Sequence, residues 1–201
     1  MCLSLAVLAQ PLAAQPPLLA EYDPGSRTWS LSNGHIEAEF RLTRNNLLRL
    51  QTLGRPGGKQ WVANARPAGS PIYLKIDELV LDQDTAWALQ NTRTEAATRG
   101  GVRHVIQLRN EDAKAEVTLR LEIHPGQPFL RTSYTYRNLD QTRRFVEEAR
   151  FLNLRLNPER HPIKAFYVDQ VRQGTSLMFQ THERCLAQQP DGTVSVRGGA
   201  Y

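Results

Sequence analysis

Cysteine is scarce in this chain, with only Cys2 and Cys185 in 201 residues. Charge is absent from the first twenty residues, where an apolar run over residues 3–9 leads into a small-residue stretch that ends at Ala14. This order is typical of a signal peptide cleaved after Ala14, although the basic start of such a peptide is missing. We therefore expect a secreted or periplasmic protein. Because cleavage would remove Cys2, the mature chain could form no internal disulfide, and we assign Cys185 no role.

Long apolar runs are also missing. A bilayer span needs about 20 apolar residues, so no membrane span is expected. The alternative interpretation of the N-terminal run is an apolar end of a cytosolic protein, and we favour export. The resulting division has a signal peptide at residues 1–14, a linker at 15–27 and one domain at 28–201. Because a strand-like segment at 194–197 stops soon after it begins, we expect this domain to be incomplete at its C-terminal end.

Helical periodicity is nearly absent, and the only short helical candidate is Thr142–Leu152. Apolar and polar residues alternate instead, most clearly over Ala115–Ile123, where the apolar side chains share one face. Side chains alternate across a strand, so this segment predicts a strand with one buried and one solvated face. The further strand candidates are residues 36–42, 47–53, 72–81, 87–94, 102–108, 129–137, 149–156, 164–171 and 176–180.

Turn-forming residues separate these candidate strands. They lie at 32–34, 56–58, 99–101, 110–112, 125–128 and 138–140, and each group contains Gly, Asn, Asp or Pro. Many short strands with such turns and without intervening helices predict an all-β fold, a large antiparallel β-sandwich rather than βαβ units.

The chain is basic, with a formal net charge of +5 and a pI near 9.5. Its arginines are scattered along the sequence, and no stretch combines clustered basic residues with aromatic residues, as binding to a phosphate backbone requires. Nucleic acid is therefore not an expected partner. We interpret the basic excess as a surface feature that favours solubility.

The five histidines lack the short spacings that place two ligands on one face, so neither a metal site nor a cofactor is expected. His104 lies on the apolar face of its predicted strand, which indicates a hydrogen-bonded core histidine. His124 precedes a turn proline and is expected to be exposed or to cap the turn.

Catalytic constellations are absent as well. The sequence has no Gly-x-Ser-x-Gly elbow, no Cys/His pair and no phosphate-binding glycine loop. Asp169 ends an apolar strand, as some nucleophiles of barrel enzymes do, but it lacks a partner carboxylate and is more typical of a turn cap. We assign no catalytic residue.

Aromatic side chains can stack on the apolar face of a sugar ring, while planar polar groups bind its hydroxyls. Trp61 follows a glycine-rich turn and is the best candidate for an exposed aromatic, although core burial is at least as consistent with its position. Arg131 and Arg137 share the polar face of strand 129–137, which is either solvated or an interdomain contact. The candidate carbohydrate-binding residues are thus Trp61, Arg131 and Arg137.

Two segments resemble parts of known glycosidases. Residues 29–40, followed by Leu47–Leu50, resemble the opening of the N-terminal domain of the α-galactosidase-like enzymes of glycoside hydrolase family 36. Leu121–Arg131, followed by Tyr134–Asn138, is similar to the apolar-x-Tyr-Pro-Gly-x-Pro-Phe-x-Arg…Asn stretch of galactose-mutarotase-like supersandwiches, with His124 in place of the common tyrosine. The resemblance covers about residues 29–157.

The resemblance implies a supersandwich domain of a secreted glycosidase whose (β/α)8 catalytic barrel and two carboxylates would lie beyond Tyr201. The expected partners are then carbohydrate and that downstream catalytic domain, and the chain itself would not be catalytic. Homo-oligomerisation stays open. Two alternatives are an extracellular glycan-binding or structural β-sandwich without activity, and a stand-alone mutarotase-like sugar epimerase, whose histidine motifs we do not find.

Overall fold

The structure, a computed structural model, describes residues 17–58, 60–61, 70–151, 163–173 and 176–186, with side chains as far as Ala149. Strands make up almost all of its regular structure, and the only helical segment in these ranges is a 3-10 turn at Thr98–Gly100. Every strand pairing is antiparallel. The expected all-β fold is confirmed.

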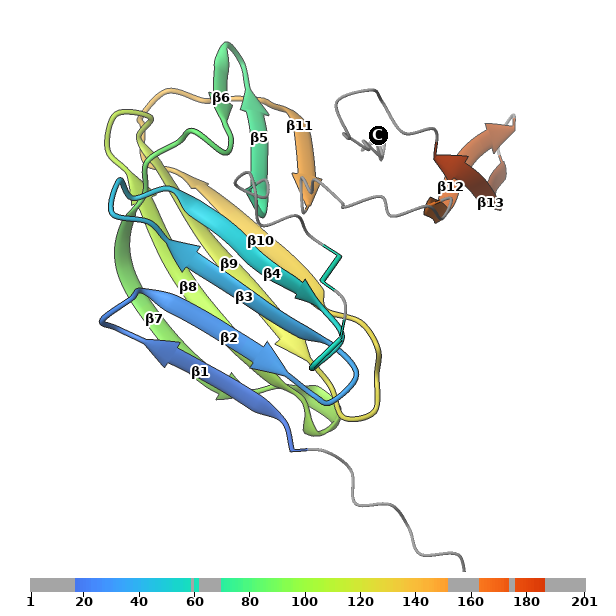
Figure 1. Ribbon diagram of the computed structural model, residues 1–201. Coiled ribbons are helices and arrows are strands. Elements are labelled where there is room, and N and C mark those ends of the chain that lie inside the picture. Colours follow the sequence, from blue (N-terminus) through green and yellow to red (C-terminus); the bar gives the residue numbers. More distant parts are fainter. Residues whose placement is uncertain (1–16, 59, 62–69, 152–162, 174–175, 187–201) are drawn as a thin grey trace, which may run out of the picture.

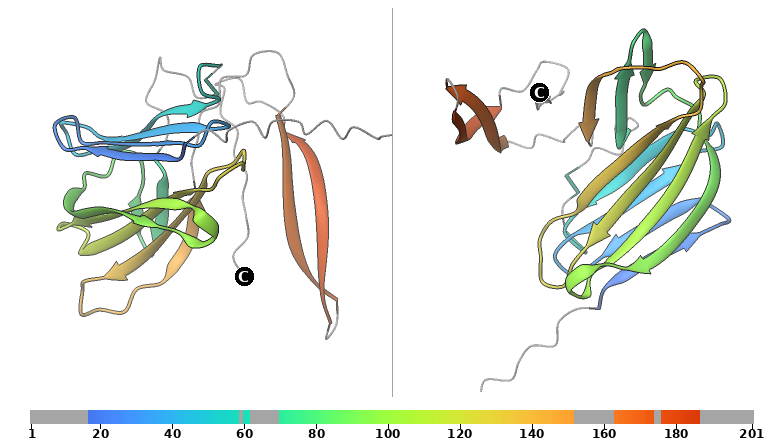
Figure 2. Two further views of the ribbon diagram at one scale, coloured as in Figure 1. Left: turned by 90° about the horizontal axis from the view of Figure 1, so that it is seen from below. Right: turned by 180° about the vertical axis from the view of Figure 1, so that it is seen from behind.

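Two four-stranded sheets form the sandwich. The first has the order β1-β2-β3-β4, and its strands are β1 (Leu19–Asp23), β2 (Thr28–Ser32), β3 (Glu37–Leu42) and β4 (Leu48–Gly54). The second has the order β10-β9-β8-β7, and its strands are β7 (Ala88–Ala96), β8 (Val102–Asn110), β9 (Ala115–Ile123) and β10 (Arg131–Asn138). The two sheets lie face to face, as the layered view in Figure 2 shows most clearly.

One apolar core fills the space between the sheets. Trp29, Phe40 and Leu50 from the first sheet, and Ile106 and Leu119 from the second, have no exposed surface. Their alternate positions along each strand explain why the sequence alternates, since only one face of each sheet meets the other.

Polar side chains inside this core are hydrogen-bonded between the sheets. The Trp29 indole Nε1 donates to Thr92 Oγ1 at 2.8 Å. The buried His104 ring contacts Thr94 Oγ1 at 2.9 Å and the Ser30 carbonyl oxygen at 3.2 Å. The prediction that His104 is a hydrogen-bonded core histidine is confirmed.

The segment predicted as a linker, residues 15–27, contains the edge strand β1. This strand is only five residues long and stays largely accessible to solvent, so its apolar residues carry a weak signal. Pairing with β2 fixes it in the sheet, and the Tyr22 ring stacks on Trp29 with ring centroids 5.0 Å apart.

A smaller sheet of order β11-β5-β6 lies beside the sandwich and contains β5 (Ile72–Ile76), β6 (Leu79–Leu81) and β11 (Val146–Phe151). The single strand predicted for residues 72–81 is wrong, because the chain reverses at Asp77, whose φ is 50°. The helical candidate Thr142–Leu152 is also wrong where it is described, since pairing with β5 holds its middle as β11.

The remaining described strands, β12 (Ile163–Gln173) and β13 (Ser176–Leu186), form an antiparallel pair. They replace the strand candidates 164–171 and 176–180 with longer strands. The signal peptide predicted at residues 1–14 lies outside the described residues, and Cys185 and Asp169 lie on strands whose side chains are not described. No helix in the described part of the chain is long and apolar enough to cross a membrane.

Candidate functional site: an arginine-rich sheet face

The outward face of the second sheet gathers arginines that are scattered in the sequence. Because Val117, Leu119 and Leu121 of β9 point into the core, the residues between them point outward, and the strand register brings their neighbours on β7, β8 and β10 to the same face. The charged residues on this face, here called the arginine face, are Arg93, Glu95, Arg103, Arg109, Glu116, Arg120, Glu122, Arg131 and Arg137. Six arginines thus stand against three glutamates.

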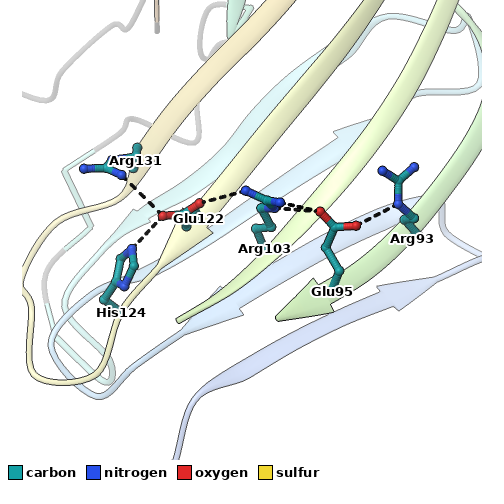
Figure 3. Close-up of polar contacts among 6 residues, drawn as sticks. All are labelled: Arg93, Glu95, Arg103, Glu122, His124 and Arg131. Atoms are coloured by element: carbon teal, nitrogen blue, oxygen red, sulfur yellow. Dashed lines mark hydrogen bonds and ion pairs between the residues drawn. The ribbon is translucent and has the colours of Figure 1, made fainter. Parts of the chain in front are cut away.

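A row of alternating charges crosses all four strands at one end of this face (Figure 3). Glu95 of β7 stands opposite Arg103 of β8, which stands opposite Glu122 of β9, which stands opposite Arg131 of β10. Arg103 contacts Glu95 at 2.7 Å and Glu122 at 3.6 Å, and Arg131 contacts Glu122 at 3.5 Å. Opposite charges in register stabilise neighbouring strands, and they also fix where each guanidinium lies.

Glu95 at the β7 end of the row accepts hydrogen bonds from two arginines. The Nε atoms of Arg93 and Arg103 donate to its two carboxylate oxygens at 2.8 and 2.7 Å. These bonds hold the pKa of Glu95 below its usual range, with Arg93 making the larger contribution. Glu95 therefore remains a carboxylate that orients arginines, and it is unsuited to act as a general acid.

Glu122 is the buried centre of the row, with only 7% of its surface exposed. In addition to its two arginine partners, it accepts a hydrogen bond at 2.6 Å from Nε2 of His124. Both carboxylate oxygens are therefore occupied by partners from β8, β10 and the start of the β9–β10 loop. A buried carboxylate needs such partners, because an unpaired charge away from water is costly.

His124 anchors the β9–β10 loop to the rest of the sandwich. It is 6% exposed, so the expectation that it would be exposed is wrong. The ring lies against Gly101, where an added Cβ would come within 2.6 Å of Nδ1. The backbone carbonyl of His124 accepts a hydrogen bond from the Asn33 side chain at 2.7 Å, so it is Asn33 that ties this end of the loop to the first sheet.

Asn33 joins the two sheets at this end of the molecule. Its amide nitrogen donates to the carbonyls of His124 and Gln127, both at 2.7 Å. Its side-chain oxygen accepts from the backbone N–H groups of His35 and Ile36, both at 3.0 Å. One buried side chain therefore satisfies four backbone groups and couples the β2–β3 turn to the β9–β10 loop.

Arg120 differs from the other arginines of the face. No carboxylate of the described residues lies within ion-pair distance of its guanidinium. Its cross-strand neighbours on the face are Val105 and Ser133. Val105 is buried although its position along β8 is an outward one.

An uncharged polar row lies next to Arg120. It consists of Asn91, Gln107, Thr118 and Thr135, which stand in register on the four strands. Two residues along a strand correspond to about 7 Å, so this row and Arg120 are close enough to contact the same oligosaccharide. Further along, Arg137 pairs with Glu116 at 3.8 Å, and Arg109 pairs with Glu111 at 2.8 Å.

Two of the three predicted carbohydrate-binding residues lie on the arginine face. Arg131 and Arg137 have side chains that are 63% and 74% exposed, and they are separated along β10 by six residues, about 20 Å. Trp61 lies elsewhere, after β4, where its backbone N–H bonds to the Leu53 carbonyl at 2.7 Å. Its side chain is 38% exposed.

Four other aromatic side chains lie inside or against the core. Trp29 and Trp87 are buried, and Tyr134 and Tyr136 pack against the core cluster. The Tyr134 hydroxyl donates to the Tyr73 carbonyl at 2.9 Å and so ties β10 to β5. These rings are therefore structural.

No protein-family model matches this chain, and no curated protein is significantly similar to it. Within the described residues, no group of three or more His, Cys, Asp or Glu side chains could hold a metal ion. The functional assignment of the chain therefore depends on its own geometry. The arginine face is the feature that sequence reasoning missed, although a signal was present: its arginines occupy the polar positions of the alternating segments.

Proposed function

We propose that this chain is the non-catalytic β-sandwich of a secreted, α-galactosidase-like glycoside hydrolase, and that it supports and contacts a catalytic barrel of the same protein. The observation that carries the proposal is the meeting of the two segments that resemble such enzymes. Asn33 of the first segment bonds to the carbonyls of His124 and Gln127 in the second, 91 and 94 residues away. Segments that resemble one family and also form one structural unit support that family better than two separate resemblances would.

The chemistry of the described side chains favours a supporting role over catalysis. Glu95 and Glu122 both contact arginines of neighbouring strands, and these contacts fix the positions of their side chains. Glycoside hydrolysis requires two carboxyl groups that flank a bond, one of them able to donate a proton. Among the described residues we find no such pair facing an open cleft.

A stand-alone sugar epimerase would need a histidine that can exchange a proton with a sugar. His104 is completely buried, and both of its ring nitrogens bond to protein atoms. His124 is also buried, and its Nε2 is hydrogen-bonded to the Glu122 carboxylate. The geometry therefore offers this alternative no support.

The test is to isolate the native protein from its source organism with an antibody raised against this chain. We expect the antibody to capture, outside the cytoplasm, a polypeptide larger than 22.8 kDa that hydrolyses an α-galactoside. The recombinant chain alone should release no product from the same substrate. Capture of a cytoplasmic protein, or of one without glycosidase activity, would overturn the proposal.

A further inference from the structure

We propose that the arginine face binds an acidic polysaccharide and that Arg120 receives the carboxylate of a uronic acid residue. This inference deepens the proposed function, because it names the class of carbohydrate that the sandwich would bring to a glycosidase. The site consists of Arg120 with the neighbouring polar row of Gln107, Thr118 and Thr135, flanked by the arginines of the charged row. These residues alternate along β8, β9 and β10 with those that face the core, so the site lies on the outward side of the second sheet, the layer seen against the first sheet in Figure 2.

The first step is the sign and the excess of charge. Six arginines and three glutamates share the face, and each glutamate is already paired with at least one arginine. Arg109 pairs with Glu111 beside the face, so six arginines stand against four carboxylates and an excess of two positive charges is left for a ligand. A surface of this kind attracts polyanions and increases their rate of association.

The second step is the position of Arg120. Its guanidinium has no carboxylate partner among the described residues, in contrast to Arg103, which has two. A guanidinium presents a planar fork of donors that matches a carboxylate with two parallel hydrogen bonds. Arg120 stands in register with the buried Val105 of β8 and with Ser133 of β10, so its guanidinium has no charged cross-strand neighbour.

The third step distinguishes a polysaccharide from nucleic acid. Single-stranded nucleic acids bind to basic grooves in which aromatic side chains stack on the bases. The described strands place no aromatic side chain on the arginine face, because the tyrosines of β10 point to its other side. Hydroxyl and amide groups are present instead, beside Arg120, and such neutral groups pair with sugar hydroxyls.

The experiment measures binding of the purified chain to polygalacturonate by isothermal titration calorimetry. We expect binding at low salt that weakens at 0.5 M NaCl, because exposed charges are screened. Arg120→Gln should weaken binding about tenfold or more, since it removes a charge-assisted pair of hydrogen bonds. The matched control is Arg41→Gln, which removes the same charge from an exposed position on β3 of the other sheet and should leave binding unchanged.

Three ligand controls decide the class of partner. Fully methyl-esterified polygalacturonate keeps the sugar but loses the carboxylates, and it should not bind. Dextran sulfate carries sulfate groups and no carboxylates, and oligo(dT) carries phosphates. Binding to either that is as tight as binding to polygalacturonate would indicate a general polyanion site and would overturn the proposal. Failure to bind polygalacturonate, or equal losses for Arg120→Gln and Arg41→Gln, would also overturn it.

Two measurements distinguish a failure of this inference from misfolding of the variant and from a failure of the proposed function. The urea midpoint of each variant shows whether Arg120→Gln is folded, and a folded variant with unchanged affinity counts against the site. The antibody capture of the native enzyme tests the proposed function without any acidic ligand. An active native glycosidase whose sandwich ignores polygalacturonate would therefore remove this inference alone.

Discussion

Acidification from pH 6.5 to pH 5.5 should destabilise this protein through His104. The His104 side chain is completely buried between the two sheets. The Ser30 carbonyl can only accept a hydrogen bond, so Nε2 of His104, which contacts it, must carry the proton. Nδ1 of His104 is then unprotonated and accepts a hydrogen bond from the Thr94 hydroxyl. This neutral form uses both ring nitrogens. Burial lowers the pKa of His104 below its usual value of 6.5, although the hydrogen bonds to backbone groups oppose this shift.

The sign follows from the two states of the protein. Below pH 6.5 the unfolded chain binds a proton at His104, while the folded chain does not until the pH reaches its lowered pKa. The contribution of neutral His104 to the free energy of unfolding is therefore complete above pH 6.5, and it is lost as the pH falls toward the pKa of His104 in the folded protein. The slope in this window is at most about 1.4 kcal/mol per pH unit. The lowered pKa values of Asp23, Glu95 and Asp140 produce losses only at more acidic pH, since the ordinary pKa is 3.8 for Asp and 4.5 for Glu.

The assay is urea unfolding at pH 7.5, 6.5 and 5.5, followed by the fluorescence of buried tryptophans such as Trp29. His104→Gln should be less stable at every pH but should lose the extra decline between pH 6.5 and 5.5. His35→Gln, at an exposed histidine of the β2–β3 turn, should keep the wild-type decline. If the wild type and His104→Gln decline equally, the reasoning about His104 is refuted.

Two further predictions concern the coupling of the β9–β10 loop to the sandwich. Asn33→Ala leaves four backbone groups without their partner and should reduce the free energy of unfolding by about 2–4 kcal/mol, while the exposed Asn91→Ala should change it by less than about 0.5 kcal/mol. Gly101→Ala places a methyl group 2.6 Å from the His124 ring and should cost about 1–3 kcal/mol. Gly25→Ala is its control, since a Cβ there meets only a side-chain oxygen at 3.3 Å. Chemical denaturation measures all four variants, and similar losses for a variant and its control would contradict either prediction.

The alternation of the sequence predicts most of the sandwich because each strand has one face in the core and one in water. Residues 115–123 show this best, and β9 has the predicted bounds. The strand β1 was missed because it is short and largely accessible to solvent, so burial imposes little on its composition. The turn at Asp77 was missed because the left-handed backbone there is set by the pairing of β5 with β6 and is not marked by glycine or asparagine.

The arginine face could not be predicted from the alternation of any one strand, because alternation does not give the register between strands. Alternation places Arg120 on the polar side of β9, but only the register with β8 and β10 shows which residues stand beside it. Arginines that are ten or more residues apart in the sequence thus become neighbours, and the expectation of a scattered surface charge does not hold for this face. His124 was expected to be exposed or to cap its turn because a turn proline follows it, whereas it is buried beside Glu122, Gly101 and Asn33.

The hydrogen bonds that cross between the sheets also set an order for folding. Each sheet is a meander of strands that follow one another in the chain, so each can form from local contacts. The bonds between the sheets join residues 63 to 94 positions apart. At a synthesis rate of about 5–20 residues per second, the first sheet would wait roughly 5–20 s with its apolar face uncovered. The apolar face of the first sheet is therefore most in need of protection in this interval, before the second sheet emerges and Asn33 closes the sandwich.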